Sequence, residues 1–293
     1  MMQFRLLRLS LAILALGGGG SSMADSITFT GNVANDFSTS NPNVHITPVS
    51  DNPLNIGQAS FMTQNGWVSG WAIPDIRSAY NANTDTLYVG INTFKNSQGV
   101  QAIVGDADGN GNPGTAAPQT TASGGVDLPN LGGRESVAVA FAPDGPNGPS
   151  SPGVPLIIAG VPADKTGLPA NVNSAQDYFL VSQYKGVNLG LAYNFSQPLP
   201  NLNGGLAFNP SAQTPGFEFT IKNFKGSGLD ATKGFWIRAY AGTPDDVVAG
   251  EAALAFTRIP AFAGQEIPEP TAILLWSAVA GGAVLRRYRR KAI

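Results

Sequence analysis

Four side chains with oxygen ligands stand at alternate positions of one glycine-rich segment, residues 105–114. They are Asp106, Asp108, Asn110 and Asn112. Ca²⁺ collects 6 to 8 oxygen ligands from carboxylates, amides and carbonyls, and a tight turn with a ligand at every second residue brings several of them together. The spacing therefore predicts a calcium-binding turn with these four residues as candidate metal ligands.

This turn matches part of the calcium loop of EF-hand proteins. Asp106, Asp108, Asn110 and Gly111 occupy positions 1, 3, 5 and 6 of that loop, where the glycine allows a sharp turn. Position 12 is Ala117 in place of a bidentate glutamate, and no helical pattern flanks the segment. Two interpretations stay open: a calcium turn on a β scaffold, and an Asx-rich turn without metal. Further carboxylates for the calcium turn would come from neighbouring acids: Asp75, Asp85, Asp127 and Glu135.

Groups for other kinds of catalysis are sparse. The chain has no cysteine and a single histidine, His45, which excludes thiolate nucleophiles and two-histidine metal sites. Strand alternation places His45 opposite Val44 and Ile46, on what we expect to be the solvent face. A glycoside hydrolase needs only two carboxylates, so three glutamates keep that alternative open: Glu135, Glu218 and Glu251. Alternation also predicts solvent-facing positions for Glu218 and Glu251.

Three tryptophans in the body of the chain have two possible roles. Trp67, Trp71 and Trp236 could stack on the apolar faces of sugar rings if they were exposed. A β protein of this size also needs large side chains in its core, and core packing is the interpretation that we favour.

The elements that must position these residues are predicted to be strands. Residues 25–265 show alternation of apolar and polar side chains with period two and no long helical period, as in residues 217–222. This pattern predicts an all-β fold, an antiparallel β-sandwich of jelly-roll type, in one domain. The strands are expected at residues 27–33, 44–49, 67–73, 86–92, 100–104, 136–141, 156–161, 178–184, 189–195, 217–222, 235–240 and 252–259.

Two connections have clear turn chemistry. Residues 81–85 read Asn-Ala-Asn-Thr-Asp between two apolar segments, which predicts a hairpin turn. Residues 144–152 are crowded with glycine and proline, and we expect a long surface loop without any strand there.

The charge of the body argues against one class of partner. Residues 25–265 hold 10 lysines and arginines against 17 aspartates and glutamates, a net charge of −7. A folded domain with this balance lacks the basic surface that a phosphate backbone requires, so we expect no nucleic acid as partner.

The amino-terminal segment has the features of a secretory signal. Arg5 and Arg8 precede an apolar run at residues 9–16, and four glycines then lead to a small-residue site that ends at Ala24. This order predicts a signal peptide over residues 1–24, cut after Ala24 by signal peptidase.

The carboxyl-terminal segment has three parts in a fixed order. Residues 268–270 are Pro268, Glu269 and Pro270, and residues 271–285 are apolar without a charge. A basic cluster closes the chain: Arg286, Arg287, Arg289, Arg290 and Lys291. An uncharged helix that ends in arginines predicts a transmembrane segment whose basic end stays in the cytoplasm.

Residues 267–293 resemble the PEP-CTERM sorting signal of exported Gram-negative bacterial proteins, in which a Pro-Glu-Pro motif, an apolar helix and an arginine cluster stand in this order. The resemblance implies recognition of residues 266–293 by an exosortase, a multispanning membrane protease. It also implies a transient anchor in the inner membrane, followed by release or attachment at the cell surface or in an extracellular polysaccharide matrix, as in a biofilm.

Together these observations predict an exported, non-catalytic surface or matrix protein that associates with extracellular polysaccharide. The alternative is a secreted carbohydrate-active hydrolase, which would need two of its carboxylates to converge in a cleft.

Overall fold

The computed structural model describes residues 27–48, 64–106, 109, 111, 131, 135–165, 178–187, 193–209, 212–242, 252–253 and 255–262. Strands in antiparallel sheets make up nearly all of the regular structure there, which confirms the all-β prediction. The two helical elements are short: α1 (Val33–Asp36) and the 3₁₀ helix η3 (Phe224–Ser227). The predicted signal peptide and sorting signal lie outside these residues. None of the helices in the described part is long and apolar enough to cross a membrane.

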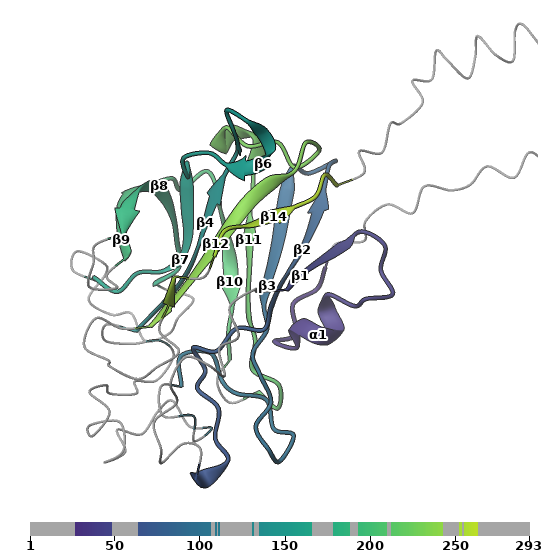
Figure 1. Cartoon of the computed structure of the whole chain (residues 1–293), viewed down its shortest axis with the longest axis vertical. Helices are drawn as coiled ribbons and strands as arrows, with labels where there is room; N and C mark the ends of the chain where they lie inside the picture. Colours follow the sequence, from purple (N-terminus) through teal and green to yellow (C-terminus); the bar gives the residue numbers. More distant parts are fainter. Residues whose placement is uncertain are drawn as a thin grey trace, which may run out of the picture.

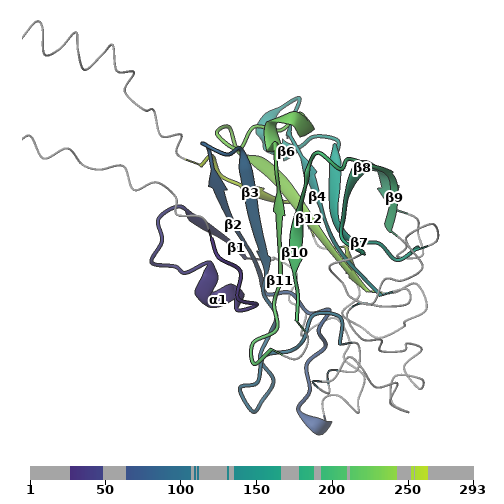
Figure 2. The ribbon, with the colours of Figure 1, turned by 180° about the vertical axis from the view of Figure 1, so that it is seen from behind.

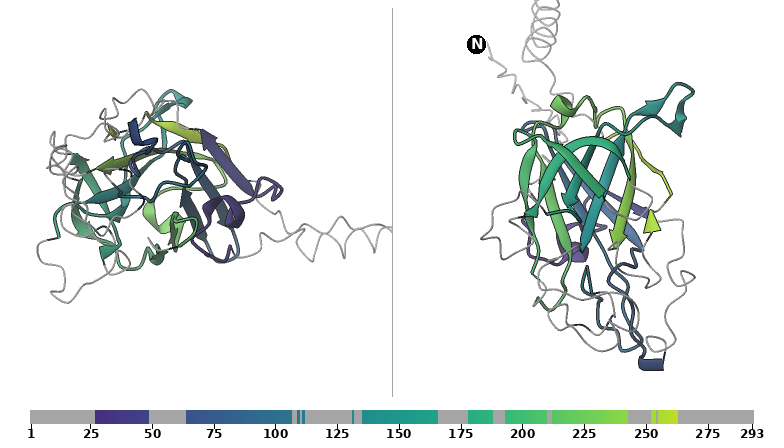
Figure 3. Two further views of the ribbon diagram at one scale, coloured as in Figure 1. Left: turned by 90° about the horizontal axis from the view of Figure 1, so that it is seen from below. Right: turned by 90° about the vertical axis from the view of Figure 1, so that its left-hand side faces the viewer.

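The strands form two main sheets (Figure 1). The first sheet has the order β1 (Val44–Pro48), β2 (Asp75–Asn81), β3 (Thr86–Ile91), β11 (Phe217–Ile221) and β10 (Asn203–Ala207). The second has the order β13 (Ala252–Ala253), β12 (Phe235–Gly242), β4 (Ser136–Ala142), β7 (Ile157–Val161), β8 (Leu180–Val187) and β9 (Tyr193–Pro198), and β14 (Thr257–Ile259) also pairs with β12. We call them the five-stranded sheet and the β12 sheet. A separate hairpin, β5 (Asp144–Gly145) and β6 (Gly148–Pro152), projects beside them (Figure 3).

One apolar core joins the two sheets. Alternate residues of the five-stranded sheet, such as Leu87, Val89 and Phe219, belong to the same buried cluster as Val139 and Phe141 of the β12 sheet. Successive strand residues point to opposite faces, so the alternation in the sequence is what gives each sheet its apolar inner face.

An amino-terminal arm covers the other face of the five-stranded sheet. This arm, residues 27–37, runs beside β1 and β2 and includes α1 (Figure 2). Val33 and Phe37 are fully buried against Ala79 of β2. Gly90 makes this contact possible, because a Cβ at that position would lie 2.7 Å from the Phe37 ring and 2.8 Å from Val33.

Most of the expected strands are present, as is the hairpin turn, which joins β2 to β3 over Asn81 to Thr86. Three expected strands are wrong. Residues 27–33 form part of the arm, because the Asn32 side chain accepts a hydrogen bond from the Asn35 amide and starts α1. Residues 67–73 are irregular, with a turn at Gly70 and Trp71, and residues 100–104 take part only in an isolated bridge between Lys95 and Gln101.

Four further strands were not expected: β5, β6, β2 and β10. Residues 144–152, predicted to lack strands, contain the β5–β6 hairpin, in which Pro152 stands at an edge where its missing amide hydrogen costs little. The strand β2 breaks strict alternation with three adjacent buried residues, Ser78, Ala79 and Tyr80. The strand β10 contains two glycines, which have low strand propensity.

Candidate functional site

The predicted calcium turn begins at a buried aspartate. Asp106 is 0% exposed, and its Oδ2 accepts a hydrogen bond of 2.6 Å from the Gly111 amide. Its carbonyl accepts a hydrogen bond of 2.8 Å from the Gly70 amide, which ties the turn to the loop before β2. Gly105 and Gly111 have φ values of 88° and 85°, a backbone conformation that residues with a side chain rarely adopt.

The other predicted ligands, Asp108, Asn110 and Asn112, lie outside the described residues. Within the described ranges, no group of three or more histidine, aspartate or glutamate side chains could hold a metal ion. The calcium site therefore stays a prediction.

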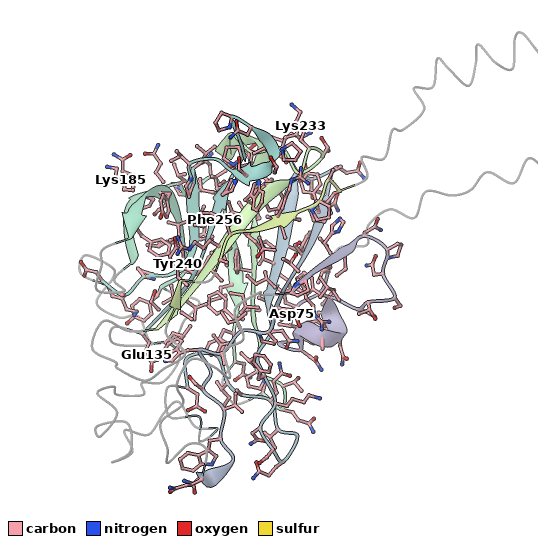
Figure 4. The ribbon with its side chains drawn as sticks, viewed as in Figure 1. Asp75, Glu135, Lys185, Lys233, Tyr240 and Phe256 are labelled. Atoms are coloured by element: carbon pink, nitrogen blue, oxygen red, sulfur yellow. The ribbon has the colours of Figure 1, made fainter. Side chains whose placement is uncertain are left out.

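Two of the acids considered as further calcium ligands, Asp75 and Asp85, have other partners. Asp75 forms an ion pair with Arg77 at 2.9 Å, and Asp85 lies beyond the other end of β2, where its carboxylate accepts a hydrogen bond of 2.7 Å from the Tyr80 hydroxyl. Asp127 is outside the described residues. Glu135, next to the start of β4, lies far from Asp75 across the molecule (Figure 4).

Glu135 belongs to a cluster that the sequence analysis missed. The Lys165 ammonium donates a hydrogen bond of 2.8 Å to the Glu135 carbonyl and lies 5.3 Å from the centre of the Tyr178 ring. Burial lowers the pKa of Lys165 to about 8, although the nearby Glu135 charge acts in the opposite direction. The members are far apart in the chain, so no local motif could have indicated the cluster.

Glu218 has the predicted orientation but not the predicted exposure. It is on the outer face of the five-stranded sheet, as alternation requires, yet it is 0% exposed because the arm covers it. Its Oε2 accepts a hydrogen bond of 2.8 Å from the Gly31 amide of the arm. The expectation that Glu218 faces solvent is therefore wrong. Alternation shows on which face of the sheet a side chain lies, but it does not show whether another segment covers that face. Glu251 lies outside the described residues.

His45 also differs from its expected environment. It does lie opposite Val44, but its face of β1 points toward Phe262, whose ring centre is 4.4 Å from the imidazole centre. Burial lowers the pKa of His45. The prediction of a solvent-facing histidine is wrong because the face of β1 that carries His45 packs against Phe262, whereas Val44 lies on the opposite face, which the arm covers.

The tryptophans are engaged in the fold. Trp71 is 1% exposed and belongs to the core, as favoured from the sequence. Trp236 of β12 donates its indole N–H to Asp144 Oδ1 at 3.0 Å. Trp67 lies in the irregular segment before β2 and so does not share a strand face with Trp71.

A group of aromatic side chains lies on the outer face of the β12 sheet. The guanidinium of Arg238 lies 5.5 Å from the ring centre of Tyr240 and 5.4 Å from that of Phe256 (Figure 4). The Tyr240 hydroxyl is 3.2 Å from the Tyr184 hydroxyl. Tyr240 is 1% exposed, so it does not present its ring to a ligand.

Within the described part of the chain, an open depression of about 550 Å³ lies at one end of the five-stranded sheet, and we call it the polar depression. It is lined by Thr84, Asp85, Thr86, Tyr88, Thr220, Lys222 and Asn223. Tyr88 of β3 and Thr220 of β11 are register partners, which places them side by side on the outer face. The β2–β3 turn and the end of β11 supply the rest of the lining.

The wall at the β2–β3 turn is held in place by Asp85. Both of its carboxylate oxygens accept hydrogen bonds from the Lys225 amide of η3, at 3.2 and 3.1 Å, in addition to the bond from Tyr80. Asp85 and Asn223 both have a φ of 48°, a left-handed conformation that aspartate and asparagine tolerate. The β2–β3 turn is therefore tied both to β2 through Tyr80 and to η3 through Lys225.

The polar groups of this depression are suited to a hydroxyl-rich ligand. Thr220 and Tyr88 are partly exposed and offer hydroxyl groups, and Asn223 offers an exposed amide. Lys222 is exposed, and its ammonium has no ion pair or hydrogen bond within the described part of the chain. Burial raises the pKa of Tyr88, so its hydroxyl keeps its proton and can donate. The outward alternation of Thr220 and Lys222 is the sequence signal that could have indicated this surface.

Comparisons of this chain with family models, curated proteins and solved structures find no match.

Proposed function

We propose that this chain is an exported β-sandwich protein of jelly-roll type that works without catalysis at the cell surface or in the extracellular matrix. Its carboxyl-terminal segment is a PEP-CTERM-type signal, read by an exosortase-like protease after signal peptidase has removed residues 1–24. The order of Pro268, Glu269 and Pro270, the apolar run and the basic cluster supports this route.

A non-catalytic role is supported by the positions of the candidate catalytic groups. His45 packs on Phe262, and Glu218 is covered by the arm on the outer face of the five-stranded sheet. Glu135 precedes β4 of the other sheet. A retaining or inverting glycosidase needs two carboxyl groups about 5 to 9.5 Å apart around one bond. Glu218 is on the five-stranded sheet and Glu135 directly precedes the other sheet, and the apolar core is packed between these two sheets.

We propose further that the protein binds extracellular polysaccharide at the polar depression. The observation that carries this step is the exposed Lys222 ammonium beside the hydroxyls of Tyr88 and Thr220 on a fixed wall. Hydroxyl donors and acceptors match sugar hydroxyls, and a lysine adds attraction for a carboxylate. The ligand class is therefore a hydroxyl-rich polysaccharide with carboxylate groups, such as a polyuronate, held through its hydroxyls and a single carboxylate at Lys222 and not through an extended basic surface.

Binding to immobilised alginate, a polyuronate, and to dextran, a neutral polymer, tests this step. We expect retention on alginate that weakens with salt, and a loss of several-fold in affinity for Lys222→Gln. Lys185→Gln is the matched control, because Lys185 is an exposed lysine of β8 in the other sheet (Figure 4). An equal loss of affinity in both variants would mean that the overall charge of the protein, and not the polar depression, binds alginate. Turnover of either polymer that disappears in Glu135→Gln would instead support a hydrolase.

Calcium at Asp106, Asp108, Asn110 and Asn112 remains part of the proposal. A bound ion at a hundredfold excess over its Kd would stabilise the fold by about 2.7 kcal/mol. EGTA should then lower the melting temperature of the protein, and should leave the melting temperature of the Asp106→Ala, Asp108→Ala double variant unchanged. If EGTA does not change the melting temperature of the native protein, the segment is an Asx-rich turn that binds no metal.

A further inference from the structure

We propose that the amino-terminal arm is a strap that a shared proton holds onto the five-stranded sheet, and that it opens progressively as the surrounding medium becomes less acidic. The strap covers Ala79 and borders the polar depression. This inference is independent of the ligand proposed above, since it depends only on how the arm is held.

The proposal depends first on the carboxyl group of Glu218, which forms no ion pair with a lysine or arginine in the described part of the chain. Glu218 is 0% exposed, and its Oε1 has no hydrogen-bond donor in the described structure. Its side chain meets the Asp36 side chain of α1, and two carboxyl groups can be joined by a hydrogen bond only if one of them keeps a proton. The proton on Glu218 therefore joins the sheet to the arm.

The remaining groups around this contact favour the neutral form of Glu218. Asp36 accepts hydrogen bonds from the amide and the hydroxyl of Thr30, so the arm itself supplies donors to the Asp36 carboxylate. Glu218 accepts only the Gly31 amide. Burial and the Asp36 carboxylate raise the pKa of Glu218 to about 8.

The charged and titratable groups of the neighbouring strands do not neutralise the pair. On β2, Arg77 uses Nη1 for the carbonyls of Ala34 and Phe37 and Nε for Asp75. On β3 the titratable group is Tyr88, and beyond the end of β11 it is Lys222, which lines the polar depression. The strand β10 carries no titratable side chain.

Apolar contacts, together with hydrogen bonds from Arg77 and from the Gly216 amide, hold the rest of the arm. Val33 and Phe37 are buried, and Phe29 packs edge-on against Tyr88 with ring centres 6.1 Å apart. Because Tyr88 also lines the polar depression, an open arm changes one wall of that depression. The arm thus links the proton on Glu218 to the shape of the depression.

The pH range follows from the two states of Glu218. In the open state its carboxyl group has the ordinary pKa of 4.5, and in the closed state the pKa is about 8. The closed state therefore binds one more proton between these values. The open fraction should rise roughly tenfold for each pH unit in this interval and level off above it.

The absence of cysteine from the chain allows a direct test in the full protein. Ala79→Cys places a small thiol beneath the arm, where the side chain is 3% exposed. Val100→Cys is the reference for intrinsic thiol reactivity, because Val100 is 54% exposed. We expect the labelling rate of Ala79→Cys, divided by that of Val100→Cys, to rise at least tenfold between pH 6 and pH 8.

Adding Glu218→Gln should remove this rise, because a neutral amide can hydrogen-bond Asp36 at every pH. Asp36→Asn is a second variant, which should move the rise to lower pH by removing the neighbouring charge. A ratio that is independent of pH in the Ala79→Cys protein would overturn the proposal. So would an unchanged rise in the Glu218→Gln background. Circular dichroism on each variant confirms that the sheets are folded.

Discussion

Two carboxyl groups at the edges of the core have opposite environments. Glu218 lies under the arm beside a second carboxyl group, and its pKa is raised to about 8, chiefly by burial. Asp144, at the base of the β5–β6 hairpin, accepts two hydrogen bonds from Arg258 at 3.1 Å and one from Trp236. The guanidinium of Arg258 holds the pKa of Asp144 below its ordinary value.

The difference shows that partners, and not residue type, decide what an acidic group does in this fold. The Asp144 side chain is 27% exposed and paired with a cation, so its charge supports the folded state. Glu218 is fully buried with a competing carboxylate, so its neutral form supports the folded state. The two sites should therefore respond to mutation and to pH in different ways.

Removing the cover over Glu218 should have the largest effect. Phe37→Ala deletes a fully buried ring of the arm, and a change of this kind costs about 3 to 5 kcal/mol when the site cannot collapse. Urea unfolding at pH 6 measures the loss. Val100→Ala, at an exposed position, should change the free energy of unfolding by less than about 0.5 kcal/mol. A small loss for Phe37→Ala would mean that the arm is not part of the cooperative unit.

Removing Asp144 should have the next largest effect. Asp144→Ala leaves Arg258 and the Trp236 indole without their acceptor, at a cost of about 2 kcal/mol at pH 7. Asp164→Ala is the control, because Asp164 is an exposed acid whose interactions are solvated. If the two variants lose equal stability by urea unfolding, the Arg258 pair has no special role.

The smallest effect is the opposite pH response of the two sites. Glu218 has a raised pKa, so its contribution is complete below pH 4.5 and is lost as the pH rises toward 8, by about 1 kcal/mol between pH 6 and pH 7. Asp144 has a lowered pKa, so its contribution is complete above pH 3.8 and is lost as the pH falls through the folded value.

Unfolding free energies across this range should separate the two limbs. Glu218→Gln should remove only the decrease in the free energy of unfolding above pH 4.5. Asp144→Asn should remove only the decrease at acidic pH, below 3.8. A fall in stability from pH 6 to pH 7 that is no larger in the wild type than in Glu218→Gln would contradict the raised pKa of Glu218.

The sequence predicts the fold class well and the environments of single residues poorly. Alternation over residues 217–222 correctly assigns Phe217 and Phe219 to the core and Glu218 to the other face. It cannot show that residues 27–37 return to cover Glu218, because that contact joins residues 187 positions apart. The same holds for Lys165 and Glu135, and for Arg258 and Asp144, whose proximity depends on the tertiary fold.

The central claim is that the chain is exported and processed at both ends, and intact-mass analysis of the surface and medium fractions tests it most directly. The account predicts a mature chain that starts at Asp25 and lacks residues 286–293. A secreted form that still carries Arg286, Arg287, Arg289, Arg290 and Lys291 would contradict the sorting proposal, whatever the domain binds.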